Sequence, residues 1–237
     1  MTRSILSIAL SAAAALGSVS CLGGAVAAAD PRQPTVVELF QSQGCSSCPP
    51  ANANLNAIAD RPDVIALSFA VTYWDQLGWK DTFGSPRWTA RQWDYAHRAG
   101  RPQVATPQVI VNGGTAIIGS NRRELDAAIA RAGAPHGGPA LALTGDLLAV
   151  GASAYARPSI LWLVRYDPRV RNVPIRAGEN EGRTLPHRDI VRELVKLGDW
   201  SGRAANIRIP SAREPGLAAA ILVQQGAGGP IIAARRI

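Results

Sequence analysis

The sequence predicts an α/β domain over residues 30–136, followed by a small β-rich, sandwich-like domain over residues 137–237. In the first region, continuous apolar runs of strand length alternate with helical patterns, which is typical of an α/β domain. In the second region, short apolar runs are separated by Gly, Pro and charged residues, which is typical of a β-sandwich. The Gly- and Pro-rich stretch 133–139 lies between them and predicts a linker.

Two strands and two helices are expected first in the α/β domain. Residues 35–40 and 64–71 are mostly β-branched and apolar, as in strands that are covered on both faces. Residues 49–59 begin with two prolines, which a first helical turn tolerates, and place apolar side chains on one face. Residues 86–99 follow Ser85, a favourable helix N-cap, and end before a glycine. The expected order is strand, helix, strand, helix.

A hairpin and a third helix complete the expected domain. Residues 106–111 and 115–119 have strand composition and are joined by the turn sequence Asn-Gly-Gly. Asn121, with a glutamate three residues later, predicts the start of a helix that continues to Ala132. The full order is therefore strand, helix, strand, helix, strand, strand, helix.

The second domain is expected to consist mostly of strands. Residues 189–197 fit both an alternating and a helical pattern, and we favour a strand there. The other apolar runs cover residues 140–150, 160–166, 170–175, 207–210, 217–223 and 231–233.

Residues 1–29 have the composition of a secretory signal peptide. Arg3 precedes an apolar core over residues 5–16, and three alanines end at Ala29, before Asp30. The apolar core is too short to cross a bilayer as a stable helix. We therefore expect an exported mature chain, periplasmic or secreted, with no stable membrane span.

The mature chain would retain two cysteines, Cys45 and Cys48. A disulfide across so short a loop constrains the unfolded chain very little, so redox chemistry is a better reason for the pair than stability. Cysteines at a helix N-terminus are more acidic than free cysteine. We expect Cys45 to be the attacking thiol and Cys48 to be the more buried, resolving thiol, which releases the substrate. The predicted activity is that of a thiol-disulfide oxidoreductase.

The distribution of charge along the chain indicates which kinds of partner to expect. The chain has a net charge of +8, and residues 137–237 hold 14 basic and 8 acidic side chains. We expect this half to dock a partner. The sequence has no array of basic and aromatic residues that would indicate nucleic-acid binding. No cofactor or metal is expected. The expected substrates are polypeptide thiols or disulfides, with a redox recycling partner whose identity is unknown.

The element order, the segment Cys45-Ser46-Ser47-Cys48 and the pair Thr106-Pro107 together resemble the thioredoxin superfamily. The resemblance implies a thioredoxin-like domain in which Pro107 faces the cysteines through a cis peptide bond. It also implies that the backbone at Thr106 pairs with a bound peptide. Thioredoxin itself carries Gly-Pro between its cysteines, where this chain has Ser-Ser. The resemblance therefore does not define the redox potential, and oxidase, isomerase and reductase activities all remain as alternatives.

A narrower resemblance covers both halves. Residues 38–51, 73–81, 106–113 and 178–187 resemble a family of secreted bacterial proteins catalogued as domain of unknown function 1223. No activity is assigned to that family, so the resemblance implies fold and export rather than a reaction.

Three further residues are candidates for the site. Glu38 is a carboxylate in an apolar strand; it either relays the resolving thiol's proton or reaches solvent at the strand edge. Trp74 and Trp79 lie in a long connection rich in tryptophan. They form either an apolar platform for a substrate polypeptide or local core packing.

Two other functions stay open. A copper-binding chaperone would use the two thiolates and one further donor, with His97, His136 and His187 as candidates. A non-enzymatic scaffold would keep the pair as a structural disulfide. A papain-like hydrolase is excluded, because Ser46 and Pro49 replace a glycine and an aromatic residue of that family's nucleophile segment.

Overall fold

The computed structural model describes Met1, residues 33–153 and residues 157–237. Apart from Met1, the predicted signal peptide 1–29 lies outside the described residues. The bounds below confirm the strands and helices expected from residue 35 onward, and the ambiguous segment 189–197 is part of a strand. The elements are β1 (Thr35–Gln41), α1 (Pro49–Asn56), β2 (Val64–Ala70), the short 3-10 helix η1 (Asp75–Leu77), α2 (Pro86–Arg98), β3 (Gln108–Val111), β4 (Thr115–Ile117), α3 (Arg122–Ala132), β5 (Leu141–Thr144), β6 (Leu147–Val150), β7 (Ser159–Asp167), β8 (Arg171–Pro174), β9 (Thr184–His187), β10 (Ile190–Trp200), β11 (Ala205–Arg208), β12 (Ala218–Gln224) and β13 (Ile231–Arg236).

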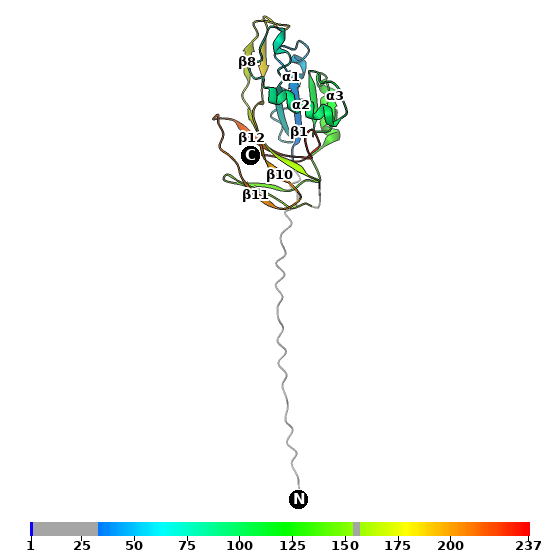
Figure 1. The fold of residues 1–237 in the computed structure, drawn as a ribbon, viewed down its shortest axis with the longest axis vertical. Coiled ribbons are helices and arrows are strands. Elements are labelled where there is room, and N and C mark those ends of the chain that lie inside the picture. The colour runs from blue at the N-terminus through cyan, green and yellow to red at the C-terminus, as the bar shows by residue number, and fades with distance from the viewer. Residues whose placement is uncertain (2–32, 154–156) are drawn as a thin grey trace.

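A mixed sheet of eight strands runs through the molecule, in the order β13-β12-β7-β10-β2-β1-β3-β4 (Figure 1). β1 pairs in parallel with β2 and antiparallel with β3. β3 and β4 form the expected hairpin, and its turn residues Asn112 and Gly113 have φ values of 46° and 68°. Such left-handed conformations are favoured by Asn and Gly, which explains the Asn-Gly-Gly sequence.

Both halves of the chain contribute to this sheet. β10 starts beside β2, where Ile190 pairs with Ser68, and β7, β12 and β13 continue the sheet with antiparallel pairing. The position 136/137 lies in the connection between α3 and β5. The C-terminal part is β-rich, and its strands extend the sheet that the N-terminal part begins. The division into domains at this position stays a prediction.

A second sheet covers part of the C-terminal half. Its strand order is β11-β6-β5, and β8 and β9 form a separate two-stranded ribbon. The apolar side chains of β5 and β6 pack against β7, β12 and β13, which explains the alternating burial along β6. The buried cluster consists of Leu141, Leu148, Val150, Leu161, Leu163, Trp200, Ile221, Val223, Ile232 and Ala233.

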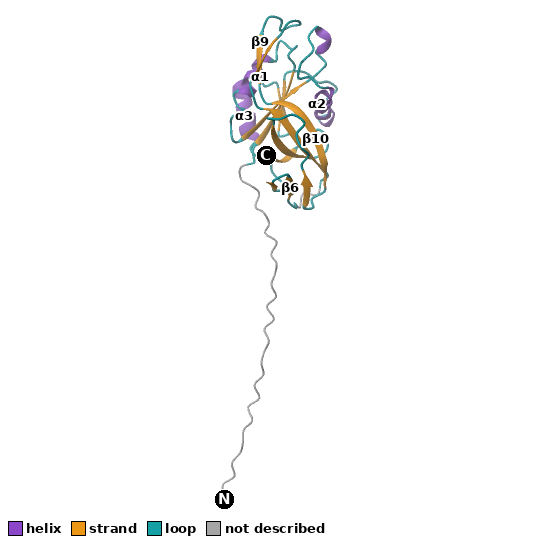
Figure 2. Cartoon of the chain, turned by 90° about the vertical axis from the view of Figure 1, so that its left-hand side faces the viewer, coloured by secondary structure: helices purple, strands orange, loops and turns teal. Residues whose placement is uncertain are grey.

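Helices cover both faces of the N-terminal strands, with α1 and α3 on one face and α2 on the other (Figure 2). Successive residues of a strand point to opposite faces. Val37 and Leu39 therefore pack with α1 and α3, whereas Val36 and Phe40 pack on the face of α2. Burial on both faces accounts for the continuous apolar character of this strand.

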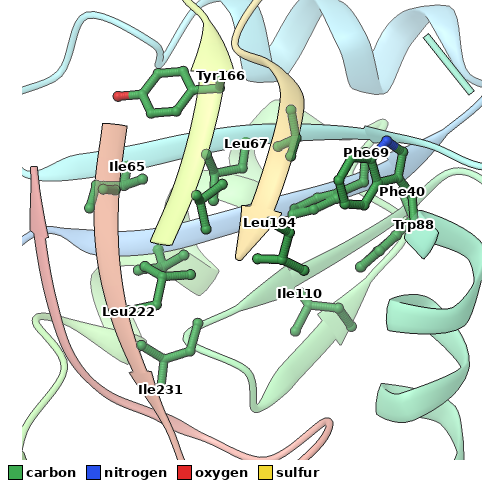
Figure 3. Close-up of a cluster of buried hydrophobic side chains, with 14 of the residues drawn as sticks. Phe40, Ile65, Leu67, Phe69, Trp88, Ile110, Tyr166, Leu194, Leu222 and Ile231 are labelled. Atoms are coloured by element: carbon green, nitrogen blue, oxygen red, sulfur yellow. The ribbon is translucent and has the colours of Figure 1, made fainter. Parts of the chain in front are cut away.

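The face of α2 holds a cluster that spans both halves of the chain (Figure 3). Phe40 and Phe69 stack with ring centroids 5.3 Å apart, and Trp88 of α2 meets Phe69 edge-on at 5.5 Å. Leu194 of β10 and Leu222 of β12 complete the cluster from the second half. The apolar faces of the two halves are therefore buried against each other.

A polar network lies within this apolar environment. Glu38 of β1 is fully buried, and its Oε1 accepts a hydrogen bond of 2.7 Å from Nε of Arg91 on α2. The Tyr95 hydroxyl donates to the other carboxylate oxygen. Gln224 of β12 accepts a 3.2 Å hydrogen bond from Arg91 and donates one of 3.0 Å to the Tyr95 oxygen. The network thus pairs a buried carboxylate and connects β1, α2 and β12.

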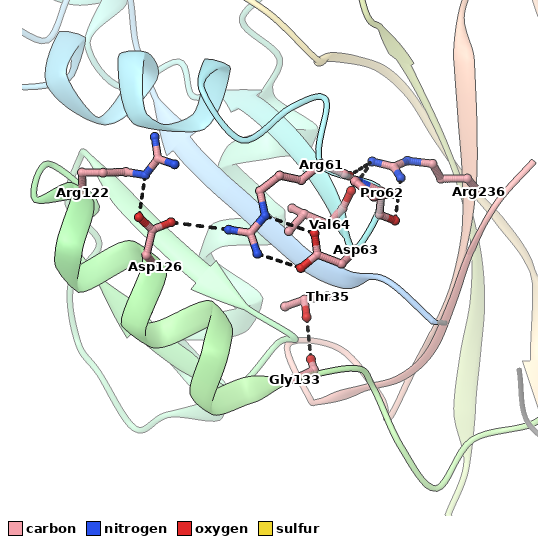
Figure 4. A network of polar contacts seen from close by, with 9 residues as sticks. All are labelled: Thr35, Arg61, Pro62, Asp63, Val64, Arg122, Asp126, Gly133 and Arg236. Carbon is pink, nitrogen blue, oxygen red and sulfur yellow. Dashed lines mark hydrogen bonds and ion pairs between the residues drawn. The ribbon is translucent and has the colours of Figure 1, made fainter. Parts of the chain in front are cut away.

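A second network is more exposed and connects the chain's last strand to β2 (Figure 4). The Arg236 guanidinium donates to the carbonyls of Arg61, Pro62 and Val64. Arg61 in turn pairs with Asp63 at 2.7 Å. Exposed ion pairs of this kind contribute about 1 kcal/mol or less each, so the network positions the C-terminal strand more than it stabilises it.

Within the described residues, no helix has the length and apolar composition needed to cross a membrane.

Removal of Arg91 is expected to destabilise the fold strongly, because it leaves Glu38 buried without its ion pair. We expect Arg91→Met to lower the free energy of unfolding by about 3–5 kcal/mol, measured by urea denaturation. A double variant that also carries Glu38→Leu should recover most of the loss. Arg122→Met, at an exposed pair 2.8 Å from Asp126, is the control and should change the value by about 0.5 kcal/mol or less. Equal losses in both single variants would contradict this account.

Candidate functional site

Cys45 and Cys48 form a disulfide at the start of α1, with their Cα atoms 5.4 Å apart. Cys48 is the residue that precedes the first helical position, and Pro49 and Pro50 follow it. The loop between β1 and α1 is held by two backbone hydrogen bonds, from Cys45 N to the Ser42 carbonyl and from Cys48 N to the Cys45 carbonyl. The buried strand therefore delivers both cysteines to one helix terminus, as the sequence predicted.

The two cysteines differ less in exposure than expected. Both side chains are fully buried in the disulfide form, so the expectation that Cys45 is the more exposed one is wrong for this state. Ser46 and Ser47, between them, are exposed. The Ser47 hydroxyl lies 3.3 Å from Cys45 Sγ, close enough for a hydrogen bond to that sulfur. Cys45 is thus adjacent to a donor, even though solvent does not reach it.

Trp74 contacts both the predicted proline segment and the cysteine loop. The Cβ of Trp74 lies 3.4 Å from where a Cβ on Gly44 would be, so Trp74 packs directly beside the residue that precedes Cys45. The indole Nε1 of Trp74 donates a 2.7 Å hydrogen bond to the Thr106 hydroxyl. The Thr106–Pro107 peptide bond is cis, as the superfamily resemblance implied. Trp74 therefore connects the cysteine loop to Thr106, the residue before the cis proline.

Trp79 contacts the other side of the same loop. Its Nε1 donates a 2.9 Å hydrogen bond to the buried side chain of Gln43, whose backbone N–H donates to Asp81 at 2.7 Å. Burial raises the pKa of Asp81 to about 6, against the opposing effect of hydrogen bonds from the N–H groups of Gln43 and Phe83. The tryptophan-rich connection thus supports the residues that precede Cys45.

The second half of the chain also contributes to the site, through a turn over residues 178–182. Asn180 is fully buried, and its Nδ2 donates 2.9 Å hydrogen bonds to the carbonyls of Gln43 and Cys45. Glu179 accepts a 3.0 Å hydrogen bond from the backbone N–H of Ser46. The glycines at both ends of the turn have φ values of 77° and 78°. This turn, which we call the cap, lies directly on the cysteine loop.

Sequence reasoning did not identify Glu179 or Asn180 as site residues. The cap lies more than 130 residues from the cysteines, and no local pattern indicates which loop it contacts. The signal available was the Gly-Glu-Asn-Glu-Gly sequence itself, since two flanking glycines indicate a tight turn. An asparagine within such a turn is also well suited to bond to backbone groups.

Glu38 lies among the residues of α2 described above, with hydrogen bonds to Arg91 and Tyr95. It is fully buried and does not reach solvent at a strand edge. Its predicted role as a proton relay stays a prediction.

His187 at the end of β9 is an unusual buried group. It is 1% exposed, both ring nitrogens lack a hydrogen-bond partner, and its ring meets Phe83 edge-on with centroids 5.8 Å apart. Burial lowers the pKa of His187 from 6.5 to about 4. The imidazole is therefore neutral at physiological pH.

The geometry gives little support to the copper alternative. Within residues 33–153 and 157–237, no three His, Cys, Asp or Glu side chains are grouped in a way that could hold a metal ion. Each candidate histidine has other surroundings: the ring of His97 lies beside that of Trp93, His136 is exposed, and His187 lies against Phe83.

These features define a mixed-sheet protein with a Cys-x-x-Cys disulfide at a helix start and a cap from its β-rich half. The chain belongs to the family described as protein of unknown function (DUF1223), which it matches over residues 36–224. The crystal structure of protein AGR_C_4864 from Agrobacterium tumefaciens is similar, with 30% identity, a TM-score of 0.68, and coverage of 86% of this chain and 93% of that one.

A more distant likeness concerns the fold alone. HBP35 of Porphyromonas gingivalis has 14% identity and a TM-score of 0.53, with coverage of 88% of this chain and 76% of that one. No curated protein matches this sequence.

His187 is expected to make stability depend on pH. Between pH 6.5 and about 4, His187 is protonated in the unfolded chain but stays neutral in the folded protein. The folded state therefore loses stability as the pH falls through this range. His187→Phe removes the effect. Relative to the variant, the wild-type protein should lose about 3 kcal/mol of unfolding free energy between neutral pH and pH 4. Because the pKa of Asp81 is raised, this carboxyl group increases the stability of the folded state as the pH falls. It does so in both the wild-type protein and the variant, so it does not change the difference between their unfolding free energies.

The measurement is urea denaturation across this pH range. His136→Gln, at an exposed position, is the matched control. Parallel pH profiles for wild type and His187→Phe would contradict the assignment.

Asn180 is expected to limit access to the disulfide. Because Asn180→Ala removes the two hydrogen bonds from this side chain to the cysteine loop, of about 1 kcal/mol each, the cap should open more often. We expect dithiothreitol to reduce the disulfide about ten- to thirtyfold faster in this variant. The rate is measured by quenched alkylation, and Asn172→Ala, at an exposed position in β8, is the control. An unchanged rate would mean that the reductant reaches the sulfurs without displacing the cap.

Proposed function

We propose that this protein is an exported thiol-disulfide oxidoreductase, with Cys45 as the attacking thiol and Cys48 as the resolving thiol. The observation that carries the proposal is the Cys45–Cys48 disulfide at the start of α1, with Trp74 connecting its loop to Thr106. A disulfide of this span adds little to stability, so exchange chemistry is the better account of it.

We also propose a thioredoxin-like fold for the N-terminal part. The element order from β1 to α3 is the one expected for such a domain. The placement of α1 and α3 on one face and α2 on the other supports it, as does the cis bond before Pro107. The proposed export rests on the composition of residues 1–29.

The reaction proceeds through a mixed disulfide. A thiolate of a substrate polypeptide attacks Cys45 Sγ, the Cys45–Cys48 bond breaks, and Cys48 leaves as a thiolate that takes up a proton. A second substrate thiolate then attacks the substrate sulfur of the mixed disulfide and releases Cys45. The substrate gains a disulfide and this protein becomes the dithiol. In the reverse direction the dithiol reduces a substrate disulfide, and Cys48 resolves the mixed disulfide by attacking Cys45 Sγ.

The substrate is proposed to lie along Trp74, Thr106 and Pro107. Trp74 is half-buried and lies beside Gly44, so its exposed part offers an apolar contact next to Cys45. Trp79 supports the loop through Gln43, and neighbouring Leu77 is half exposed. These residues suit an unfolded or extended polypeptide with apolar side chains better than a small polar thiol.

The reduction potential tests the proposal first. We expect the Cys45–Cys48 couple to equilibrate with glutathione buffers, with a potential above about −300 mV, as measured by thiol alkylation of the purified mature protein. A value near or above the glutathione couple would indicate oxidation or isomerisation of exported proteins, and a value near that of thioredoxin would indicate a reductase. A pair that stays oxidised well below that limit is a structural bridge, and the scaffold function would then replace this one.

The order of attack has its own test. With an unfolded polypeptide that carries a disulfide as substrate, the Cys45 thiolate of Cys48→Ser attacks that disulfide and one substrate sulfur leaves as a thiolate. The mixed disulfide through Cys45 should then accumulate, because no resolving thiol remains. Cys45→Ser should accumulate far less, and non-reducing electrophoresis separates the two results. The reverse pattern would exchange the two roles.

A further inference from the structure

Glu179 of the cap carries a negative charge at the place where reduction of the disulfide would create another. Its carboxylate accepts the backbone N–H of Ser46, the residue directly after Cys45, at 3.0 Å. This hydrogen bond holds the pKa of Glu179 below its usual 4.5, so the group is ionised at neutral pH. The side chain is exposed, yet its position is well defined.

The position of Glu179 is set by its neighbours in the cap. On its C-terminal side, buried Asn180 bonds to two carbonyls of the cysteine loop, and Arg183 donates a 2.7 Å hydrogen bond to Asn180 Oδ1. On its N-terminal side, a Cβ on Gly178 would lie 3.3 Å from the Leu77 carbonyl and 3.4 Å from Trp79 Cβ. Both anchors hold the backbone of the cap against the loop, which places the carboxylate at Ser46.

Two prolines at the helix start reduce the number of backbone donors that could stabilise a Cys45 thiolate. The first two helical positions are Pro49 and Pro50, which have no N–H, and the Cys48 N–H donates to the Cys45 carbonyl. The Ser47 hydroxyl remains, 3.3 Å from Cys45 Sγ. The Ser46 N–H would be a further donor at this helix start, and the carboxylate of Glu179 already uses it.

We propose that Glu179 is a positioning residue that sets the redox equilibrium of the Cys45–Cys48 pair by disfavouring its reduced form. This inference rests on the proposed exchange function. In the disulfide form, the carboxylate accepts a hydrogen bond from the Ser46 N–H, and the sulfurs carry no negative charge that would repel it. After reduction, the Cys45 thiolate and the Glu179 carboxylate share one small region and compete for the Ser46 N–H. The cap thus makes the disulfide harder to reduce than the cysteine loop alone would.

The test compares equilibrium constants for reduction by glutathione at neutral pH. Reduction consumes two glutathione molecules: the first thiolate attacks Cys45 Sγ and displaces Cys48, which takes up a proton, and the second attacks the glutathione sulfur and releases Cys45 with oxidised glutathione. Glu179→Gln keeps the size of the side chain and an oxygen that accepts the Ser46 N–H, and it removes the charge. We expect the dithiol to be favoured about two- to fivefold more in this variant.

Two further variants make the comparison specific. Glu181→Gln, in the same turn, removes an equal charge away from the Ser46 N–H and should leave the constant within about 1.5-fold of wild type. Ser47→Ala removes the hydroxyl donor and should shift the constant toward the disulfide, opposite in sign to Glu179→Gln. Because Glu179 is exposed, its effect should shrink in ~1 M salt. A merely structural role for Glu179 would not give this salt dependence.

The outcomes separate this inference from the proposed function. If the constants for Glu179→Gln and Glu181→Gln are equal, the inference is wrong whether or not the protein is an oxidoreductase. If glutathione does not reduce the wild-type pair, the proposed function fails. The same constants are then measured against dithiothreitol, where Glu179→Gln is still expected to be the more easily reduced.

Discussion

The pairing of Glu38 with Arg91 is the constraint on which the arrangement of this molecule depends. A carboxylate in a strand that is covered on both faces must be neutralised and hydrogen-bonded, because an unpaired buried charge costs several kcal/mol. Arg91 supplies the charge from α2, and Gln224 of β12 completes the network from the other half of the chain. The network is satisfied only when α2 packs against both β1 and β12. It therefore favours one packing of the two halves, which apolar contacts alone specify less well.

The same joining of halves produces the site. The cysteine loop comes from β1 and α1, its side support from the segment 74–82, and its cap from residues 178–182. Because β10 pairs with β2 in the shared sheet, the ribbon β8–β9 that precedes it is placed beside α1, where Asn56 bonds to the Pro186 carbonyl. The site is thus a product of the whole fold, and the cysteine loop without the second half would lack the hydrogen bonds that Asn180 and Glu179 make to its backbone.

The sequence was sufficient to predict most of the local elements and the place of the cysteine pair at a helix start. Apolar periodicity, paired prolines and turn residues defined these elements, since each depends on interactions between near neighbours. The strand over residues 184–187 was not predicted, and the apolar run 140–150 forms two strands. The cis bond before Pro107 was implied by the superfamily resemblance, whereas the hydrogen bond between Trp74 and Thr106 was not predicted. The burial of Cys45, the cap and the shared sheet could not be predicted, because they depend on contacts between residues more than 100 positions apart. Asn180 looks like an ordinary turn residue until its partners are known.

Burial of both sulfurs affects how the proposed exchange reaction would proceed. An attacking thiolate has to approach Cys45 Sγ, and in the disulfide form the surrounding residues leave no exposed surface on it. The elements that move to admit a substrate are generally those held by few apolar contacts, and the cap fits this description, because it is held mainly by polar contacts from Asn180 and Glu179. A substrate polypeptide that displaces the cap would break those contacts and free the Ser46 N–H at the same moment. Binding would then remove the carboxylate from the cysteine loop just as a thiolate forms there, so access and reactivity would be coupled through one turn of the chain.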